Sequence, residues 1–252
     1  MKKLLLILLL LPTLAFSKTI ELNEKNTINF NQDFNAMFVA KKQVEAITKC
    51  ARNLGSNIYV TLYTPGGSIT AGKLFFDTLN ALPCKFHTIT IFSASMGYQT
   101  VQNLGKRYII PSGTLMSHRA SIRGLGGEIG GELDQVYNSI KKEVEEMEIT
   151  AANRVGITLK DYKNLISDEL WLTAKDAVKT NHADEVVLVK CDKSLMGTSV
   201  QTVRTFFGSF DVEYSDCPIV TAPIRVEVSN QEEETQLRDH LTNILKRIKF
   251  TL

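Results

Sequence analysis

A serine, a histidine and a glycine turn lie at spacings that suit acyl-transfer chemistry. Ser95 follows an apolar run, within the segment Ser93–Gly97, and His118 comes a short distance downstream. The turn Pro65–Ser68, with two adjacent glycines, precedes both. Serine attack on an amide needs a base to take the hydroxyl proton and N–H donors to hold the oxyanion. These residue types therefore indicate a serine hydrolase, and the first candidate is a peptidase.

Alternating strands and helices are expected to position these residues. The β-branched run at residues 57–62 predicts a strand that enters the glycine turn, after which Ser68 can cap a helix. The cycle repeats with a strand at 87–92 and a helix at 94–104. This βαβ spacing predicts an α/β fold with a mostly parallel sheet covered by helices. Further helices are expected at 40–53, 132–154, 159–166 and 174–180, and further strands at 107–110, 114–118 and 185–189. Residues 18–36, with a short apolar alternation at 19–22, are expected to form an arm or an edge strand.

The composition fits one large domain, or one domain with an appendage. Of the 252 residues, 44% are hydrophobic, which is enough for a full core. Lys and Arg total 29 against 27 acidic residues. A nucleic-acid-binding protein normally carries a strong basic excess, so no nucleic-acid partner is expected. The sequence has no Walker-type phosphate loop, and no cofactor is expected.

Residues 1–17 have the pattern of a secretory signal peptide. Lys2 and Lys3 precede an apolar stretch that ends near two small residues, Ala15 and Ser17. The stretch is shorter than the roughly 20 residues that a membrane span needs. We expect cleavage after Ser17 and a periplasmic or secreted protein. An uncleaved N-terminal anchor is the alternative.

Export would allow the cysteines to form disulfides. There are 4 cysteines, which permit three different pairings. Cys50 lies at the end of one expected helix and Cys84 at the end of the next, whereas Cys191 and Cys217 both lie in the C-terminal third, so we expect Cys50–Cys84 and Cys191–Cys217. Zinc binding is disfavoured because no two cysteines have the close spacing of a zinc site, and no metal site is expected.

The sequence changes character near Cys191. Residues 193–226 favour β-structure without clear periodicity, and Ser229 or Asn230 can then cap a helix. That helix has acids in its first turn and bases in its last, which suits the helix dipole. Its apolar stripe would dock on its own domain, on another subunit or on a partner. We expect a domain at 18–190 and a C-terminal extension at 191–252 that ends in this amphipathic helix.

The region from about residue 36 to 190 resembles the ClpP peptidase family of the crotonase-like superfamily. The resemblance implies a sheet of repeated β-β-α units, with the long helix from Glu132 as a handle that pairs two subunit rings. Four landmarks match in order and spacing, and their joint match is specific. They are the turn Thr64–Gly72, the nucleophile motif Ala94–Gly97, the base region Gly105–Pro111 with Leu115–His118, and the segment from Asp168–Ala177 to Ala183–Val186.

The resemblance also implies a role for individual residues. Ser95 would be the nucleophile and His118 the general base. The backbone N–H groups of Gly67 and Met96 would form the oxyanion hole. An extended peptide would bind by strand addition to a glycine-rich stretch. That stretch consists of Gly124, Leu125, Gly126 and Gly127.

Two departures from the family pattern concern the site. The third member of the catalytic triad is usually aspartate, and the spacing to Trp171 places Glu169 there, with Asp168 one residue earlier. A glutamate can orient an imidazole as an aspartate does, so Glu169 is the first choice and Asp168 the second. The family commonly has Gln-Pro after the histidine, where this chain has Arg119-Ala120, and this changes the expected substrate strand.

Cytoplasmic members of the family are supplied with substrate by ring ATPases, but ATP is not available to a protein that is exported from the cytoplasm. The expected activity is therefore ATP-independent cleavage of peptides or unfolded proteins by a homo-oligomeric ring, without an ATPase partner. A first alternative is the Ser–Lys dyad of signal-peptide peptidases, with Lys141 or Lys142 as base. A second is a catalytically inactive scaffold, and a third, disfavoured one is an acyl-CoA enzyme of the crotonase superfamily.

Overall fold

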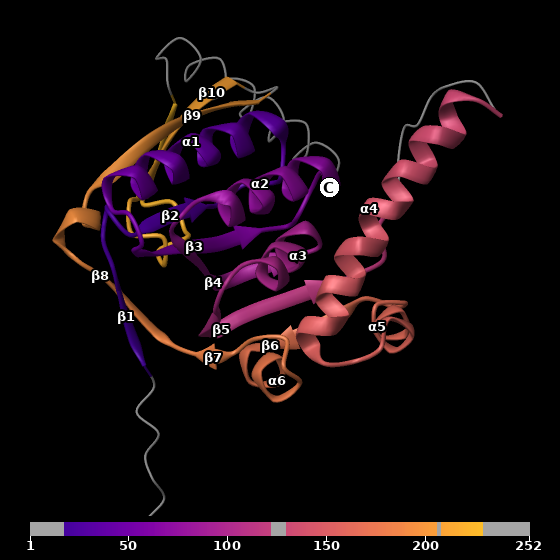
Figure 1. Cartoon of the computed structure of the whole chain (residues 1–252). Helices are drawn as coiled ribbons and strands as arrows, with labels where there is room; N and C mark the ends of the chain where they lie inside the picture. Colours follow the sequence, from indigo (N-terminus) through magenta and orange to yellow (C-terminus); the bar gives the residue numbers. More distant parts are fainter. Residues whose placement is uncertain (1–17, 122–129, 206–207, 229–252) are drawn as a thin grey trace, which may run out of the picture.

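A computed structural model describes residues 18–121, 130–205 and 208–228 (Figure 1). The expected signal peptide, the glycine-rich stretch at 124–127 and the expected C-terminal helix lie outside these residues. In the described part of the chain, no helix has both the length and the apolar character that crossing a membrane requires.

A six-stranded sheet forms the centre of the described fold. Its strand order is β2-β3-β4-β5-β6, and β7 also pairs with β5. The pairs from β2 to β5 are parallel, as is β7 on β5, whereas β6 runs antiparallel to β5. The predicted α/β fold with a mostly parallel sheet is therefore confirmed. The strands are β2 (Thr27–Phe30), β3 (Asn57–Thr64), β4 (Lys85–Ala94), β5 (Arg107–Ser117), β6 (Leu170–Thr173) and β7 (Glu185–Val186).

Some strands differ from the sequence-based expectation. Two strands were expected at 107–110 and 114–118, but the structure has one continuous strand, β5. The residues between the two expected strands belong to β5, and its pairing with β4 shifts register there. Thr90 pairs with Ile109, whereas Phe92 already pairs with Thr114. β2 lies within the segment 18–36 that was expected to form an arm or an edge strand, whereas β6 was not predicted.

Four helices lie side by side on one face of the sheet, in the order α1, α2, α3 and α4 (Figure 1). Ser68 caps α2 as predicted, because its side chain accepts a hydrogen bond from the Ala71 N–H. Asn35 caps α1 and starts it earlier than residue 40. The bounds are α1 (Ala36–Arg52), α2 (Ile69–Ala81), α3 (Met96–Asn103), α4 (Glu132–Val155), α5 (Leu159–Leu165) and α6 (Ala174–Lys179).

The other face of the sheet carries a second, smaller apolar cluster. β1 (Thr19–Leu22) pairs in parallel with β8 (Leu188–Cys191), so the expected arm is a strand. Ile20 and Leu22 pack with Tyr108 and Ile110 of β5. Both predicted disulfides are present, with sulfur–sulfur distances of 2.08 Å for Cys50–Cys84 and 2.02 Å for Cys191–Cys217.

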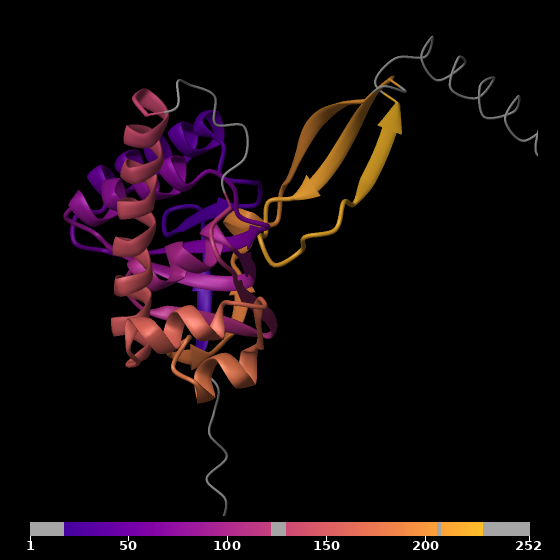
Figure 2. The same ribbon diagram turned by 90° about the vertical axis from the view of Figure 1, so that its right-hand side faces the viewer.

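Residues after Cys191 form a short helical turn, η1 (Lys193–Leu195), and then a separate antiparallel sheet. Figure 2 shows this sheet extending away from the main body. The predicted boundary at 190/191 falls inside β8, and the division into two domains stays a prediction. The sheet has the order β11-β10-β9 and consists of β9 (Thr198–Thr205), β10 (Gly208–Ser215) and β11 (Arg225–Val228).

Candidate active site

Two neighbouring strands deliver the candidate nucleophile and base to the same edge of the sheet. β4 ends at Ala94 and β5 ends at Ser117, and the parallel pairing sets Ala94 opposite Met116. Parallel strands bring their carboxyl ends together at one edge, which is where ligands bind in open α/β sheets. The next residue after each strand is Ser95 and His118 respectively, so both leave the sheet at this edge.

The two side chains are in direct contact. Nε2 of His118 lies 2.8 Å from Oγ of Ser95, which is hydrogen-bonding distance. Ser95 is the residue that precedes α3, yet its side chain makes no capping bond to that helix. The Ser95 hydroxyl is therefore engaged with the imidazole and not with the helix end. A nucleophile–base pair needs this geometry.

The backbone of Ser95 is held in an unusual conformation. Its φ of 55° and ψ of −114° lie outside the regions that ordinary residues favour. Its N–H donates to the Met116 carbonyl over 2.9 Å, which ties the residue to β5. Such conformations cost about 1–3 kcal/mol each and persist where the surroundings impose them, commonly at functional sites. Here the strand, the sharp turn and the helix together present the Ser95 hydroxyl.

The glycine turn packs directly against Ser95. A Cβ on Gly66 would lie 2.6 Å from the Ser95 Cβ, and a Cβ on Gly67 would lie 2.6 Å from the Phe34 nitrogen. No side chain fits at either position. Hydrogen bonds from Phe34 N–H to Gly66 oxygen (2.8 Å) and from Ser68 N–H to Phe34 oxygen (2.9 Å) fix the turn.

The expected oxyanion donors lie on the two segments that flank Ser95. Met96 is the first residue of α3, and the first N–H groups of a helix have no acceptor within the helix. Gly67 belongs to the turn whose other glycine contacts Ser95. Their role as an oxyanion hole stays a prediction.

Glu169 comes directly before β6, the strand that pairs with the end of β5. β6 pairs antiparallel with β5 so that its first residue, Leu170, lies opposite Ser117, the last residue of β5 before His118. The Glu169 carboxylate, however, accepts a hydrogen bond from the Trp171 indole at 3.0 Å, and its φ is 66°. The structure thus joins the Glu169 carboxylate to Trp171. The roles of Glu169 and Asp168 stay predictions.

A small pocket of about 80 Å³ opens beside Ser95 and His118. Its walls include Ile69, Met96, Val144 and Met147. They also include polar residues that were not predicted as site residues, among them Gln99 and Glu148. Gln99 is four residues after Ser95, so it lies on the same face of α3. Glu148 interrupts the buried stripe of α4 formed by Met147, Ala151, Ala152 and Val155, and a glutamate in such a stripe is a signal for it.

A buried hydrogen-bond network links Ser117, Tyr162 and the pocket residue Gln99. The Tyr162 hydroxyl lies 2.9 Å from the Ser117 hydroxyl and accepts a hydrogen bond from Gln99 Nε2 at 3.2 Å. Burial is the largest influence on Tyr162 and raises the pKa of its phenol. The phenol therefore remains a neutral partner that fixes the end of β5 just before His118.

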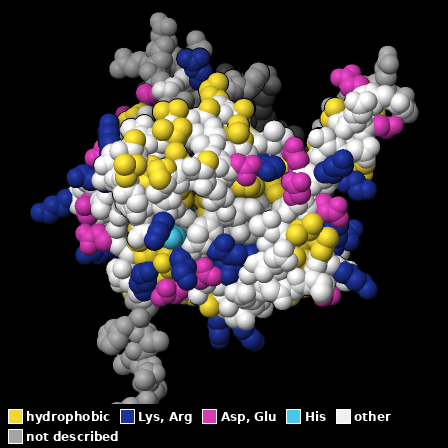
Figure 3. Space-filling view, in the orientation of Figure 1, with side chains coloured by type: hydrophobic (Ala, Val, Ile, Leu, Met, Phe, Trp, Pro, Cys, Tyr) yellow, Lys and Arg dark blue, Asp and Glu magenta, His cyan; other side chains and the backbone are white. Residues whose placement is uncertain are grey.

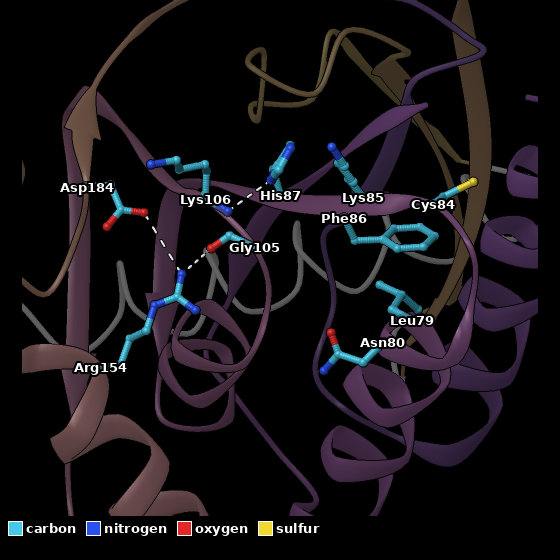
Figure 4. Close-up of a pocket in the computed structure, with 10 residues that line it drawn as sticks. All are labelled: Leu79, Asn80, Cys84, Lys85, Phe86, His87, Gly105, Lys106, Arg154 and Asp184. Atoms are coloured by element: carbon cyan, nitrogen blue, oxygen red, sulfur yellow. Dashed lines mark hydrogen bonds and ion pairs between the residues drawn. The ribbon is translucent and has the colours of Figure 1, made fainter. Parts of the chain in front are cut away.

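A larger cavity of about 530 Å³ lies at the amino ends of β4 and β5 (Figure 4). His87 lines this cavity, and both of its ring nitrogens have partners within the protein. Nδ1 accepts a hydrogen bond from the Lys106 N–H, and Nε2 lies 3.0 Å from Asn57 Oδ1. Burial, and then the charges of nearby lysines, lower the pKa of His87. None of the predicted site residues lines this cavity. Within the described residues, no group of three or more His, Cys, Asp or Glu side chains could hold a metal ion.

A serine and a histidine paired at the carboxyl edge of a mostly parallel sheet are the arrangement that a serine hydrolase needs. Comparison with known proteins agrees with this class. A family model described as Clp protease matches residues 15–190, which is more than half of the chain. The chain therefore belongs to the Clp protease family, and the resemblance seen in the sequence is confirmed.

Individual relatives are moderately similar. The chain is 30% identical over 135 residues to the ATP-dependent Clp protease proteolytic subunit 2 of Nocardia farcinica, a match that covers 51% of this chain and 64% of the relative. Subunit 1 of Corynebacterium jeikeium is also 30% identical over 135 residues, covering 70% of its length. The Streptococcus mutans subunit is 26% identical over 140 residues, covering 71% of its length. The chain thus spans just under two thirds of the Nocardia relative.

Proposed function

We propose that this protein is a serine endopeptidase that cleaves peptides or unfolded proteins through an acyl-enzyme. Ser95 is the nucleophile, His118 is the general base, and the N–H groups of Gly67 and Met96 stabilise the oxyanion. Glu169 orients the imidazole, with Asp168 as the second choice. The observation that carries this proposal is the 2.8 Å contact between Nε2 of His118 and Oγ of Ser95.

The chemistry follows from this contact. His118 Nε2 takes the hydroxyl proton as Ser95 Oγ bonds to the scissile carbonyl carbon, and the carbonyl oxygen becomes the oxyanion. The C–N bond then breaks, and the imidazolium returns the proton to the leaving amine. Water, activated by the same imidazole, hydrolyses the acyl ester and frees Ser95. No cofactor or metal takes part in these steps.

The place of action in this proposal is the periplasm or the exterior of the cell. The signal-peptide pattern of residues 1–17 and the two disulfides support it, since disulfides form and persist in oxidising compartments. The three relatives named above are called ATP-dependent. An exported enzyme has no ATP, so we propose that it acts without an ATPase partner.

We further propose that the chain assembles into a homo-oligomeric ring, with α4 as the handle between two rings. Figure 1 shows one end of α4 projecting from the body. Figure 3 shows hydrophobic side chains gathered over α1 and α2, a kind of surface that marks interaction sites. These include Met37, Val44, Ile47 and Leu74, with exposed fractions of 85%, 65%, 46% and 56%.

The alternatives have less support. Lys141 and Lys142 are exposed on α4, whereas a lysine must be desolvated to act as a neutral base. An inactive scaffold would not need a serine and a histidine at hydrogen-bonding distance. An acyl-CoA enzyme is disfavoured for the same reason.

Hydrolysis without nucleotide tests the proposal. The purified protein should cleave a fluorogenic peptide and an unfolded protein at the same rate with and without ATP, because the bond-breaking steps above use no nucleotide. Peptide release is followed by fluorescence and gel electrophoresis. Lys141→Ala and Lys142→Ala should retain the activity, since neither lysine takes part. Loss of activity in either variant would favour the dyad, and a strict need for ATP would contradict the proposal.

A further inference from the structure

The pocket beside Ser95 contains an unusual carboxylate. Glu148 projects from α4 and keeps only 11% of its side-chain exposure. It lines the same pocket as Ser95 and His118. The remaining wall is mostly apolar, with Ile69 and Met147 among its members. Buried carboxylates are rare unless they are paired, so the pairing of Glu148 decides what the pocket can bind.

Lys163, the ion-pair partner of Glu148, compensates the negative charge of Glu148 only in part. Lys163 Nζ lies 3.5 Å from Glu148 Oε2 but 3.2 Å from Glu145 Oε1, and the lysine side chain is 43% exposed. An ion pair of this kind is shared and screened by water. Burial is the largest influence on Glu148 and raises the pKa of its carboxyl, although the charges of Lys163 and Arg119 oppose the rise.

Gln99 supplies a second hydrogen-bond acceptor in the same pocket. Oε1 of Gln99 is buried and has no hydrogen-bond partner among the described residues, whereas its Nε2 is used by Tyr162. Buried polar atoms are normally satisfied, and each exception calls for an explanation. The pocket therefore combines a mostly apolar wall with two acceptors, one unpaired among the described residues and one only partly paired.

We propose that this pocket binds the substrate side chain next to the scissile carbonyl and that Glu148 selects lysine or arginine there. The inference rests on the proposed peptidase function. The apolar wall takes the methylene stem of the basic side chain, as such stems pack along apolar surfaces. The cationic end donates to Glu148 and to Oε1 of Gln99. A leucine at this position would leave Oε1 of Gln99 unpaired and Glu148 with only its partial partner Lys163, and a glutamate would add a like charge.

Peptides that differ only in this residue test the proposal. Wild-type kcat/KM for the lysine peptide should exceed that for the leucine peptide by about tenfold or more, and the glutamate peptide should be the poorest. In Glu148→Gln, the lysine-to-leucine ratio should fall about tenfold. The matched control is Glu145→Gln, which also loses a contact to Lys163 but lies outside the pocket, and its ratio should stay within about twofold of wild type.

Wild-type protein alone supplies a second readout in case Glu148→Gln does not fold. The lysine-to-leucine ratio should fall as the pH is lowered and Glu148 becomes protonated, while any effect of pH that is common to both peptides cancels in the ratio. The charged groups that influence Glu148 are Lys163, Arg119 and Glu145. Equal cleavage of the lysine and leucine peptides, or an unchanged ratio in Glu148→Gln, would overturn this inference alone. If no peptide is cleaved at all, the proposed function falls with it.

Discussion

Replacing Ser95 with alanine is expected to lower kcat for peptide hydrolysis by about 10⁴- to 10⁶-fold, and His118→Ala should have a similar effect. Ser95 Oγ and His118 Nε2 are 2.8 Å apart and act in the same step, so neither is useful without the other. The double variant should therefore be no slower than the worse of the two single variants. Steady-state kinetics on one fluorogenic peptide measure all three.

Ser93→Ala is the matched control for this prediction. Ser93 lies two residues before Ser95 on β4, and its Oγ is buried without a hydrogen-bond partner in the described part of the chain. Its removal should leave kcat within a few-fold of wild type. Independent losses that multiply in the double variant would show that Ser95 and His118 do not work as a pair. Full activity in Ser95→Ala would contradict the assignment outright.

We expect Asp184→Asn to lower the stability of the fold strongly. Arg107 is nearly fully buried, and its side chain is 3% exposed. Its Nε and Nη2 lie 3.0 and 2.5 Å from Asp184 Oδ1, and its backbone N–H donates to Oδ2 at 2.8 Å. Asp184→Asn leaves the guanidinium charge buried without a counter-ion. The free energy of unfolding should fall by about 3–5 kcal/mol, measured by urea titration.

An exposed ion pair provides the comparison for Asp184→Asn. Asp77 and Lys73 are 2.9 Å apart on α2, with side chains that are 52% and 31% exposed. Asp77→Asn should therefore change the free energy of unfolding by less than about 0.5 kcal/mol. A loss of that small size for Asp184→Asn would show that the Arg107 charge is compensated by its other partners, Gln102 and Asn181.

The Asp184 contribution should also depend on pH. Burial raises the pKa of the Asp184 carboxyl, but hydrogen bonds and charge from Arg107, together with the charge of Arg154, outweigh it and lower the pKa overall. A group whose pKa is lower in the folded state stabilises the fold above its unfolded pKa of about 3.9 and loses this effect as the pH falls further. The gap between wild type and Asp184→Asn should thus be complete near neutral pH and shrink in acid.

The candidate catalytic residues could be predicted from the sequence because they follow directly on long, regular strands. Ser95 and His118 each come one residue after a strand, and the apolar runs before them mark those strands. The disulfides could be predicted because Cys50 and Cys84 come near the ends of adjacent helices. Gly66 and Gly67 were recognisable as a turn, and the structure adds that contacts with Ser95 and Phe34 leave no room for side chains.

The sequence was uninformative where the outcome depends on contacts across the fold. β2 and β6 are four residues long, and only their neighbours in the sheet make them strands. The choice of Trp171 as partner of the Glu169 carboxylate is a side-chain arrangement that no spacing predicts. Glu148 looked like one of many acids on a long helix, because the face of α4 that covers the site is set by packing against α3 and α5.

The catalytic pairing of Ser95 and His118 is tested by identifying the residue that reacts with a fluorophosphonate. This probe reacts with activated serine hydroxyls, and peptide mapping by mass spectrometry locates the adduct. We expect one adduct per chain, on Ser95, formed far more slowly in His118→Ala because the hydroxyl then has no base. An adduct on another residue, or no adduct on correctly folded protein, would contradict the central claim that Ser95 and His118 form a catalytic pair.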